Sequence, residues 1–585
     1  MASRFLAVYG PPAALEGFAA NLSLNVKDMA LTFESDSLLF FTNDAVRAIP
    51  LSSGQGVVFG HAFTRTLPHQ KVTNLPPETS SDIVRTDGLS LVKSVWGGYI
   101  AFVLGGAQTR LCVIRDPSGT VPCLMVGKQA LWIFASDLHA LIDNGLYQPR
   151  IDWQNLKQHL RVPDLKTGRT ALSGCHEVLP GERLAVREDG LHRSYVWNPW
   201  DYTAPINAET EEIAAALTET VTQTVRAWAG SFNNILLGVS GGLDSSVLAA
   251  CLSGQGATWS GVTFATKHID GDERPFAQLL ARHLAFDLFE RHHEVDEVDI
   301  TLSGSAHLPL PSGLPYAQSH DHAKQKLATQ NDFDAFFTGQ GGDNVFGYMM
   351  SAIPLIDRMR SKGLTPALWE TFCDLCTLTE SSYWSVGKAA NRAYRDRLRP
   401  YTWSARAVYL TDFKEPPKLE HFWLDAPPQS LAGKGVHIAK ILRILNTVDG
   451  YDRRHFGPLI TPLTAQPILE LALSIPTWEW CRTGINRMPV RDAFRPALPA
   501  ELVERVSKAG PNSFAFEVIE RNAVQMTDFL CEGKLAARGL LDVRAIRESL
   551  QTPQLIRPPL HIDLMRLCEV EAWVRHWDGQ MTASP

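Results

Sequence analysis

The sequence predicts a two-domain α/β protein, in which a β-rich domain is followed by a parallel sheet covered by helices and by a mainly helical end. Three observations lead to this fold class. The chain has 585 residues, which is too long for one hydrophobic core. Short apolar runs fill roughly the first 200 residues. From Asn207 onward, apolar strands alternate with segments of helical periodicity.

The N-terminal domain, residues 1–205, consists of short apolar runs bounded by Gly, Pro, Asp and Ser, which favour turns. Met1 to Ala20 is apolar but interrupted by prolines, which suits a buried first strand better than a secretion signal. A connector rich in aromatic residues and prolines, Trp197 to Pro205, ends the domain. The expected strands are Ser37–Thr42, Gly98–Leu104, Arg110–Arg115 and Ala130–Ala135.

The second domain, residues 206–585, begins with alternating helices and strands, a pattern typical of a parallel sheet with both faces covered. From about Ser351 to the end, the pattern is mainly helical. The expected helices of the alternating part are Thr210–Trp228, Ser245–Leu252 and Arg274–Leu284, and its expected strands are Ile235–Val239, Ser260–Phe264, Leu288–His292 and Asp334–Thr338.

Composition excludes several classes of protein. A net charge of −7 lacks the basic footprint of a nucleic-acid-binding protein. No run of 18 apolar residues occurs, so no membrane-spanning helix is expected. The nine cysteines are scattered without the spacing of a disulfide framework, which favours a reduced, cytoplasmic protein.

The most informative segment is an apolar strand that runs into Ser240-Gly241-Gly242-Leu243-Asp244-Ser245-Ser246. The two glycines let backbone N–H groups approach an anion closely, and the helix that follows points its positive end at the same place. The three serines add hydroxyl donors. This arrangement predicts a cradle for a polyphosphate. It lacks the GxxxxGK[ST] pattern, so it is not the P-loop of common NTPases.

A carboxylate within an anion site implies a cation between the two. Asp244 lies in the cradle, and a second strand ends in a glycine-rich turn with one carboxylate, Asp343. Both turns are expected at the carboxyl edge of one parallel sheet and therefore in the same crevice. Mg²⁺ held by these two carboxylates and by phosphate oxygens would resolve the conflict.

These turns resemble those of the PP-loop ATP pyrophosphatases, and nearly the whole chain resembles the asparagine synthetase B family. The resemblance implies an Ntn-hydrolase-like N-terminal sandwich, a PP-loop synthetase domain, and amide bond formation through an acyl-adenylate made from ATP. The further matching segments are Gly97–Phe102, Arg115–Pro122, Ala135–Asp137, Asp272-Glu273, His292–Glu294, Gly339–Tyr348, Arg491–Phe494, Leu498-Pro499 and Arg505–Lys508.

The chain departs from this family at three positions. Glutamine-dependent members carry a nucleophilic cysteine where this sequence has Ala2, so glutamine hydrolysis is not expected. The family's general base, a glutamate, is replaced by Gln340, and a second glutamate by Asn344. Glutamine cannot take a proton from ammonium, but a peptide α-amine of pKa about 7.7–8.0 is partly neutral at pH 7 without help.

Two branches of the family lack the cysteine and use an amine carried by the substrate, namely the β-lactam and carbapenam synthetases and the lasso peptide cyclases. The length of the chain and its divergent segment after the second glycine turn are closest to the cyclases. The implied substrate is a ribosomal precursor peptide whose leader a partner protease removes. Its Asp or Glu side chain would be adenylated and attacked by the N-terminal amine. The alternatives are a β-lactam synthetase, an ammonia-dependent asparagine synthetase and a silent peptide-binding scaffold.

The resemblance also implies roles for single residues. Lys508 matches a lysine that stabilises charge on the phosphate and the tetrahedral intermediate, with Asp244 and Asp343 as its catalytic partners. Tyr348 and Arg487 are further candidates for the pocket wall. Core packing in a helical domain is the favoured interpretation of Trp384, Tyr401, Trp403 and Trp423, with a peptide pocket as the alternative. The expected ATP-binding residues are Val239, Ser240, Gly241, Gly242, Asp244, Ser245, Ser246, Phe264 and Gly339.

Overall fold

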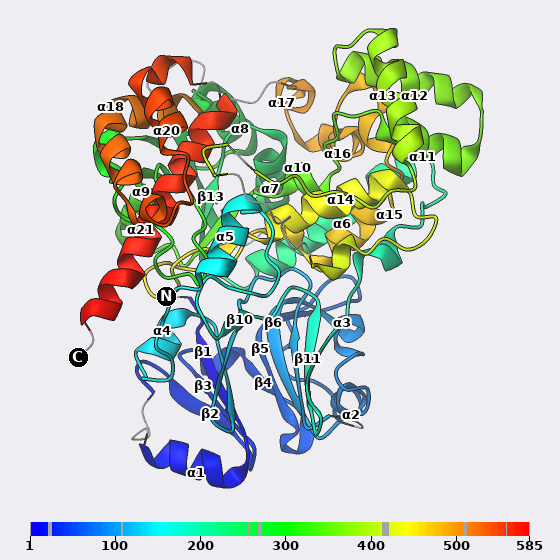
Figure 1. Cartoon of the computed structure of the whole chain (residues 1–585). Coiled ribbons are helices and arrows are strands. Elements are labelled where there is room, and N and C mark those ends of the chain that lie inside the picture. Colours follow the sequence, from blue (N-terminus) through cyan, green and yellow to red (C-terminus); the bar gives the residue numbers. More distant parts are fainter. Residues whose placement is uncertain are drawn as a thin grey trace.

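The computed structural model describes residues 2–21, 26–106, 109–254, 257–266, 272–406, 408–411, 420–506, 512–556 and 558–583. Figure 1 shows two sheets of the N-terminal domain, coloured blue to cyan, below the helices and the third sheet of the second domain. The predicted fold class is confirmed.

The N-terminal domain is a sandwich of two antiparallel six-stranded sheets, ordered β10-β8-β9-β1-β3-β2 and β12-β11-β7-β6-β5-β4. Phenylalanines fill the space between the sheets, with the ring of Phe5 5.8 Å from that of Phe102. The strands are β1 Phe5–Tyr9, β2 Ala30–Glu34, β3 Leu38–Thr42, β4 Ala48–Pro50, β5 Gly56–Thr64, β6 Val95–Leu104, β7 Leu111–Arg115, β8 Leu124–Lys128, β9 Leu131–Ala135, β10 Cys175–Glu177, β11 Glu182–Arg187 and β12 Gly190–Tyr195.

The expectation of one strand over Met1 to Ala20 was wrong in part. Only β1 is a strand there, and a helix, α1, follows at Pro12–Asn21. Pro12 is the first residue of α1, a position where the N–H that proline lacks would have no partner within the helix. The other helices of this domain are α2 Pro77–Arg85, α3 Leu91–Ser94, α4 Leu138–Ile142 and α5 Trp153–Arg161.

The second domain is built on a parallel five-stranded sheet of order β15-β14-β13-β16-β17. Four strands were predicted, while β17 was not, because two residues are too short to show a periodicity. The central strand β13 buries three successive apolar side chains, as expected for a strand covered on both faces. The strands are β13 Asn234–Gly238, β14 Thr258–Ala265, β15 Leu288–His292, β16 Ala335–Thr338 and β17 Leu459–Ile460.

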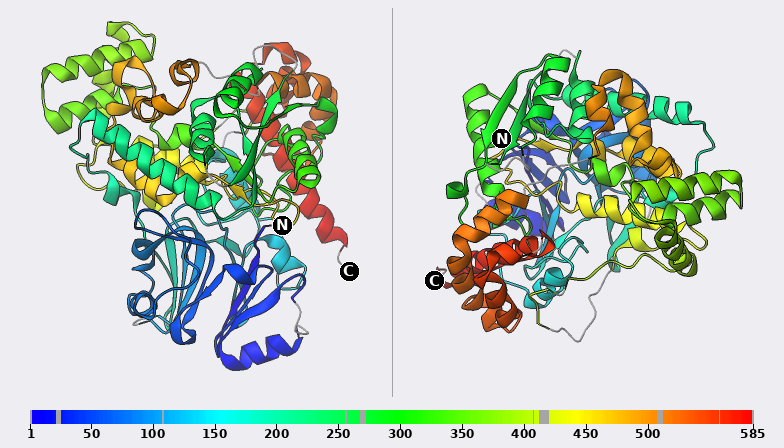
Figure 2. Two further views of the ribbon diagram at one scale, coloured as in Figure 1. Left: turned by 180° about the vertical axis from the view of Figure 1, so that it is seen from behind. Right: turned by 90° about the horizontal axis from the view of Figure 1, so that it is seen from above.

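Helices surround this sheet, as Figures 1 and 2 show. The longest of the first half, α6 Thr210–Ala229, starts with a capping box between Glu209 and Glu212 and buries a stripe that runs from Ile213 to Trp228. The others are α7 Leu243–Leu252, α8 Arg274–Leu284, α9 Ala317–Asn331, α10 Gly342–Val345, α11 Ile353–Lys362, α12 Pro366–Leu378, α13 Tyr383–Asp396, α14 Ala432–Leu445, α15 Gln466–Ser474, α16 Met488–Phe494, α17 Ala500–Glu504, α18 Asn512–Cys531, α19 Lys534–Ala537, α20 Val543–Gln551 and α21 Pro558–Ala583.

Hydrophobic packing continues across the boundary between the two domains. Phe63 of β5 and Trp96 of β6 contact Trp228 of α6, with ring centroids 5.3 and 6.5 Å apart. A second buried cluster joins β1, β3, β8 and β9 to α18 and α21. Among the helices that the structure describes, none has both the length and the apolar character needed to cross a bilayer.

One buried lysine makes stability depend on pH. Lys434 in α14 is 1% exposed and donates hydrogen bonds to the carbonyls of Leu473 and Ile475. Burial lowers its pKa from 10.5 to about 7, although Asp357 opposes this shift. Between pH 7 and 10.5 the unfolded chain therefore binds more protons than the folded chain, so stability rises with pH in this window.

Replacing this buried lysine should remove that dependence. We expect the denaturation midpoint of Lys434→Met to rise less between pH 7 and 9 than that of the wild type, whose ammonium loses its proton on folding. Thermal unfolding at several pH values measures the difference. The variant Lys388→Met, at an exposed position in α13, is the control and should follow the wild type. Identical pH profiles for Lys434→Met and the wild type would contradict the assignment.

Candidate active site

The loop between β13 and α7 has the shape that the sequence predicts for a phosphate cradle. Val239 N–H donates to the Val262 carbonyl of the neighbouring strand (2.8 Å), which places the loop at the carboxyl edge of the sheet. Gly241 has φ +64°, and a side chain there would collide with Phe276 of α8. The backbone of this turn therefore requires glycine, and it leads directly into the N-terminus of α7.

Serine hydroxyls hold this loop in place. Ser240 N–H donates to the Ser245 hydroxyl (3.2 Å), and the hydroxyls of Ser245 and Ser246 donate to the Gly242 carbonyl at 3.1 and 2.9 Å. Ser246 is fully buried and, like Gly241, does not line the cavity beside the loop. These two residues shape the cradle, whereas Ser240 and Ser245 face the space above it.

The second glycine turn packs directly on the first. A side chain at Gly339 would lie 2.7 Å from the Ser245 backbone nitrogen, so only glycine lets the end of β16 approach α7 this closely. The turn continues through Gln340 into the short helix α10, which carries Asp343. The close approach brings the two predicted carboxylates, Asp244 and Asp343, to the same place.

A guanidinium lies between these carboxylates. Arg487 Nη1 is 2.8 Å from Asp244 Oδ1 and 2.5 Å from Asp343 Oδ1, and the arginine side chain is 9% exposed. The residue caps α16 with a left-handed backbone, φ 56°, which residues other than glycine rarely adopt. Its N–H donates to the Trp480 carbonyl (2.7 Å), and its guanidinium lies 5.8 Å from the ring of Tyr348. Arg487, which sequence analysis could assign equally well to packing, is therefore central to the site.

A second arginine supports the cradle from the same side. Arg505 donates to the Gly241 carbonyl (3.1 Å) and to Glu273 Oε1 (3.0 Å), and its guanidinium lies 3.8 Å from the ring of Phe276. The buried guanidinium of Arg491 holds the backbone of this segment through the Arg505 carbonyl (3.0 Å). Arg505, whose side chain contacts the glycine turn, is thus anchored to α16 through Arg491.

The two turns border one cavity of about 560 Å³, within the usual range for a small-molecule site. Its wall opposite the turns comes from α9, for which the sequence carries no recognisable motif. The rings of His293 and His320 lie 5.2 and 4.1 Å from that of Phe264, and burial lowers the pKa of both histidines to about 4. The two imidazoles are therefore neutral at neutral pH, and together with the ring of Phe264 they offer flat surfaces that suit a planar group such as a nucleobase.

Comparison with known protein families identifies this site. The asparagine synthase family matches residues 216–575, a stretch that makes up more than half of the chain and contains both glycine turns and both arginines. The chain belongs to the asparagine synthase family. A glutamine amidotransferase domain also matches residues 73–197, within the sandwich. The protein is an ATP-dependent amide ligase of the asparagine synthetase kind, with an Ntn-hydrolase-like N-terminal domain.

Comparisons with individual proteins add little to the family assignment. No curated protein matches the chain. One similar solved structure is described as the allosteric regulatory enzyme of purine biosynthesis, with 9% identity, coverage of 57% of this chain and 89% of that chain, and a TM-score of 0.22. Another is the glutamine phosphoribosylpyrophosphate amidotransferase from B. subtilis complexed with ADP and GMP, with 9% identity, coverage of 57% and 90%, and a TM-score of 0.21. Scores this low carry no argument.

The carboxylate pair of this ligase fits a divalent cation. Both aspartates direct an oxygen at a single point, which the cationic Nη1 of Arg487 occupies. The described residues contain no group of three or more His, Cys, Asp or Glu side chains that could hold a metal. Mg²⁺ at Asp244 and Asp343 would therefore complete its shell with phosphate oxygens and water, as it commonly does beside nucleotides.

The structure brings most of the predicted site residues together, while their roles in binding and catalysis stay predictions. Lys508 lies outside the described residues. Tyr348 contacts Arg487 but does not line the cavity. The predicted residues that do line it are Val239, Ser240, Gly242, Asp244, Ser245, Phe264, Gly339, Asp343 and Arg487. The lining residues that sequence analysis did not single out for this pocket include Thr266, Glu273, His293, Tyr316, His320, Lys324 and Arg505.

The four aromatic residues do not form the alternative peptide pocket, and for two of them the favoured interpretation, core packing, is confirmed. Trp384 is 83% exposed on α13, whereas Trp403 and Trp423 are 3% and 0% exposed in the core. None of the four candidates borders the cavity, and only Tyr401 and Trp403 contact each other among the described residues. Core packing explains Trp403 and Trp423, because both belong to a buried hydrophobic cluster that also contains Trp228 and Trp480.

Proposed function

We propose that this amide ligase closes a macrolactam in a ribosomal precursor peptide, as lasso peptide cyclases do. ATP would adenylate an Asp or Glu side chain of the peptide, and the peptide's own N-terminal amine would then displace AMP. A partner protease would supply the free amine by removing the leader. The observation that carries the proposal is Gln340, whose carboxamide lies at the large cavity. Asparagine synthetases have a glutamate at this position and need it as a base.

The environment of Gln340 supports this choice of nucleophile. The side chain is exposed at the cavity, and its Nε2 donates to the Thr447 hydroxyl (3.2 Å). This hydrogen bond uses the amide nitrogen and leaves Oε1 as a hydrogen-bond acceptor. A carboxamide cannot remove a proton from ammonium near neutral pH. It can accept a hydrogen bond from an α-amine, which is partly neutral at pH 7 and needs less assistance.

The N-terminal domain gives a second line of support. Ala2, at the position that resembles the glutaminase nucleophile, has no reactive group and is 1% exposed. Its N–H donates to the carbonyl of Phe456 in the second domain (3.1 Å). An amine carried by the substrate removes the need for ammonia from glutamine at this position.

The chain's own residues account for both steps. Ser240, Ser245 and the N-terminus of α7 would hold the phosphates while the peptide carboxylate attacks the α-phosphorus and pyrophosphate leaves. Mg²⁺ held by Asp244 and Asp343 would neutralise phosphate charge. The α-amine then attacks the acyl carbon, AMP leaves with the bonding electrons, and the amine proton is released to solvent.

Leaderless peptides with matched changes test the proposal. We expect ATP–pyrophosphate exchange and AMP release with a peptide that carries an Asp or Glu at about residue eight or nine, and a product lighter by one water. The N-acetylated peptide should still support exchange but form no ring, because it lacks the nucleophile. The Asp→Asn or Glu→Gln peptide should support neither. Product formation from free aspartate and ammonium, or from a small β-amino acid, would overturn the peptide assignment.

A further inference from the structure

One loop of the second domain connects the cavity with the N-terminal domain. Residues 446–457 follow α14 and lead to β17. At its start, Thr447 accepts the hydrogen bond from Gln340 of the active-site turn (3.2 Å). At its end, the Phe456 carbonyl accepts from Ala2 N–H of the N-terminal domain (3.1 Å). The loop therefore touches the reaction site and the sandwich within about ten residues.

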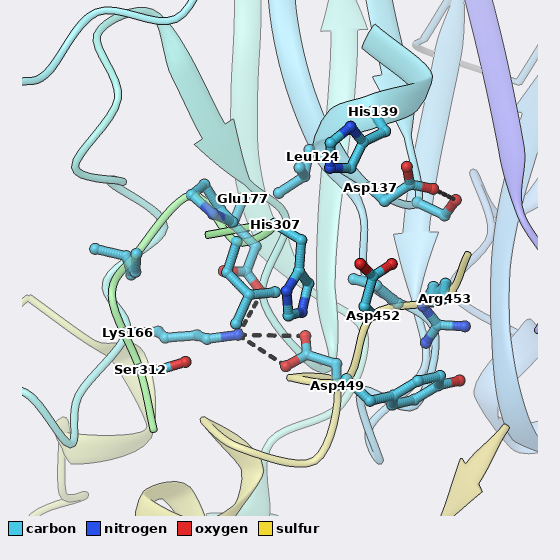
Figure 3. A pocket seen from close by; sticks show the side chains of 16 residues that line it. Leu124, Asp137, His139, Lys166, Glu177, His307, Ser312, Asp449, Asp452 and Arg453 are labelled. Carbon is cyan, nitrogen blue, oxygen red and sulfur yellow. Dashed lines mark hydrogen bonds and ion pairs between the residues drawn. The ribbon is translucent and has the colours of Figure 1, made fainter. Parts of the chain in front are cut away.

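Two residues after Thr447, the loop inserts a carboxylate into the N-terminal domain. Asp449 Oδ2 lies 2.6 Å from Arg115, at the end of β7, and its Oδ1 lies 2.9 Å from Lys166. Glu177 of β10 completes the group, at 2.8 Å from Arg115 and 3.1 Å from Lys166. Figure 3 shows Lys166 extending between Glu177 and Asp449. We call Arg115, Lys166, Glu177 and Asp449 the interdomain quartet.

The quartet is buried, and its charges balance. The side chains of Arg115, Glu177 and Asp449 are 1%, 4% and 4% exposed. Burial alone raises the pKa of Asp449, but Lys166 and Arg115 together lower it to about 2. Asp449 and its two cationic partners are therefore charged at neutral pH, since the carboxylates raise the pKa of Arg115 and of Lys166. A buried ion pair of this kind is lost only at considerable cost. The position of Asp449 is accordingly fixed relative to the sandwich.

Further contacts hold the rest of the loop. Arg453 donates to the Ser3 and Thr120 carbonyls at 3.4 and 2.6 Å, both in the N-terminal domain. His307 donates its Nε2–H to the Gly450 carbonyl (3.0 Å). At its active-site end, the exposed hydroxyl of Thr447 accepts a hydrogen bond from the exposed side chain of Gln340.

We infer that the N-terminal domain positions Gln340 for the attack of the amine. The interdomain quartet fixes the 446–457 loop, and Thr447 of this loop holds the glutamine side chain. The sandwich of this chain thus supports the part of the cavity that holds Gln340, where the amine attacks in the acyl-transfer step. Asp449 is a positioning residue, since it acts on the reacting groups through Thr447 and Gln340. The inference deepens the proposed function and depends on it for the substrate used.

Separating the two half-reactions tests the role of Asp449. We expect Asp449→Asn to reduce ring formation about 10- to 100-fold, since small displacements of reacting groups have effects of this size. ATP–pyrophosphate exchange should stay within about threefold of the wild type, because the contacts that the structure describes for the quartet are to residues outside the phosphate cradle. Asp164→Asn is the matched control. The Asp164 side chain also pairs across the domains, with Arg406, Arg443 and Arg566. Its described contact with the loop is made by the backbone carbonyl, which accepts from Asn446 and which the substitution leaves in place.

A double-mutant cycle shows whether the effect passes through Thr447. Thr447→Val removes the hydrogen bond to Gln340 at an exposed position and should slow ring formation without unfolding the protein. In the Thr447→Val background, Asp449→Asn should add no more than about a threefold further loss. Fully additive losses, or equal losses in Asp449→Asn and Asp164→Asn, would overturn the inference.

Hydrogen–deuterium exchange tests whether the quartet fixes this loop without any substrate. Asp449→Asn should increase amide exchange in residues 336–345 and 446–457, while Asp164→Asn should leave both segments as in the wild type. Unchanged exchange in residues 336–345 of Asp449→Asn would also overturn the inference. If the wild type shows no ATP–pyrophosphate exchange with any carboxylate, the proposed function fails. The hydrogen–deuterium exchange experiment would still decide whether the quartet fixes the 446–457 loop.

Discussion

Replacing Asp244 by Asn is expected to lower ATP–pyrophosphate exchange by about 10²–10³-fold, the size of effect seen when one charge-stabilising group is removed from an active site. The amide keeps the size of the carboxylate but not its charge. The cation that Asp244 and Asp343 would hold together then has one charged partner, and phosphate charge is less well neutralised. Initial rates of exchange with a saturating carboxylate substrate measure the effect.

Two further variants make this result specific. Asp343→Asn should show a loss of similar size, because both carboxylates converge on one point. Asp492→Asn is the control, since this residue lies on α16 and pairs with Arg482 outside the cavity. It should keep near wild-type exchange. A loss of less than tenfold in Asp244→Asn, with the protein folded by circular dichroism, would remove the carboxylate pair from the mechanism.

Replacing Arg115 by Met is expected to destabilise the protein by about 3–5 kcal/mol, the usual cost of removing one partner from a buried ion pair. The change leaves Glu177 and Asp449, two buried carboxylates, with Lys166 as the remaining cation of the quartet. The hydrophobic replacement fills the space but cannot compensate the extra negative charge. Native-state hydrogen exchange of β7 and β10 reports the free energy of opening at this interface.

An exposed arginine close in sequence is the matched control for this stability effect. Arg110 lies just before β7 and pairs with Glu188, but its side chain is 62% exposed. Arg110→Met should change the free energy of opening by no more than about 0.5 kcal/mol, as is usual for surface pairs. If Arg115→Met and Arg110→Met behave alike, the quartet contributes no special stability and has no physical basis for fixing the 446–457 loop.

Much of the fold follows from local patterns in the chain. The continuous burial of β13 follows from an uninterrupted apolar run, and the buried stripe of α6 follows from a period of 3.6 residues. Both patterns are visible in the sequence without any knowledge of neighbours. Where the pattern is too short, prediction fails, as for the two residues of β17. It also fails where a proline permits a helix after a strand, as at Pro12. Core packing failed as the interpretation of Trp384 for a related reason, because residue type alone does not distinguish Trp384 on the surface from Trp423 in the core.

The sequence by itself determined the carboxyl edge of the sheet as the reaction site and the two glycine turns with their aspartates. These features are local, because a turn that requires glycine and a helix N-terminus are built from a few consecutive residues. Only the tertiary structure decided what surrounds them. Arg487 meets Asp244 across 243 positions, and Arg115 meets Asp449 across 334. Such pairs depend on how whole elements pack, and no local pattern of charge or periodicity specifies them.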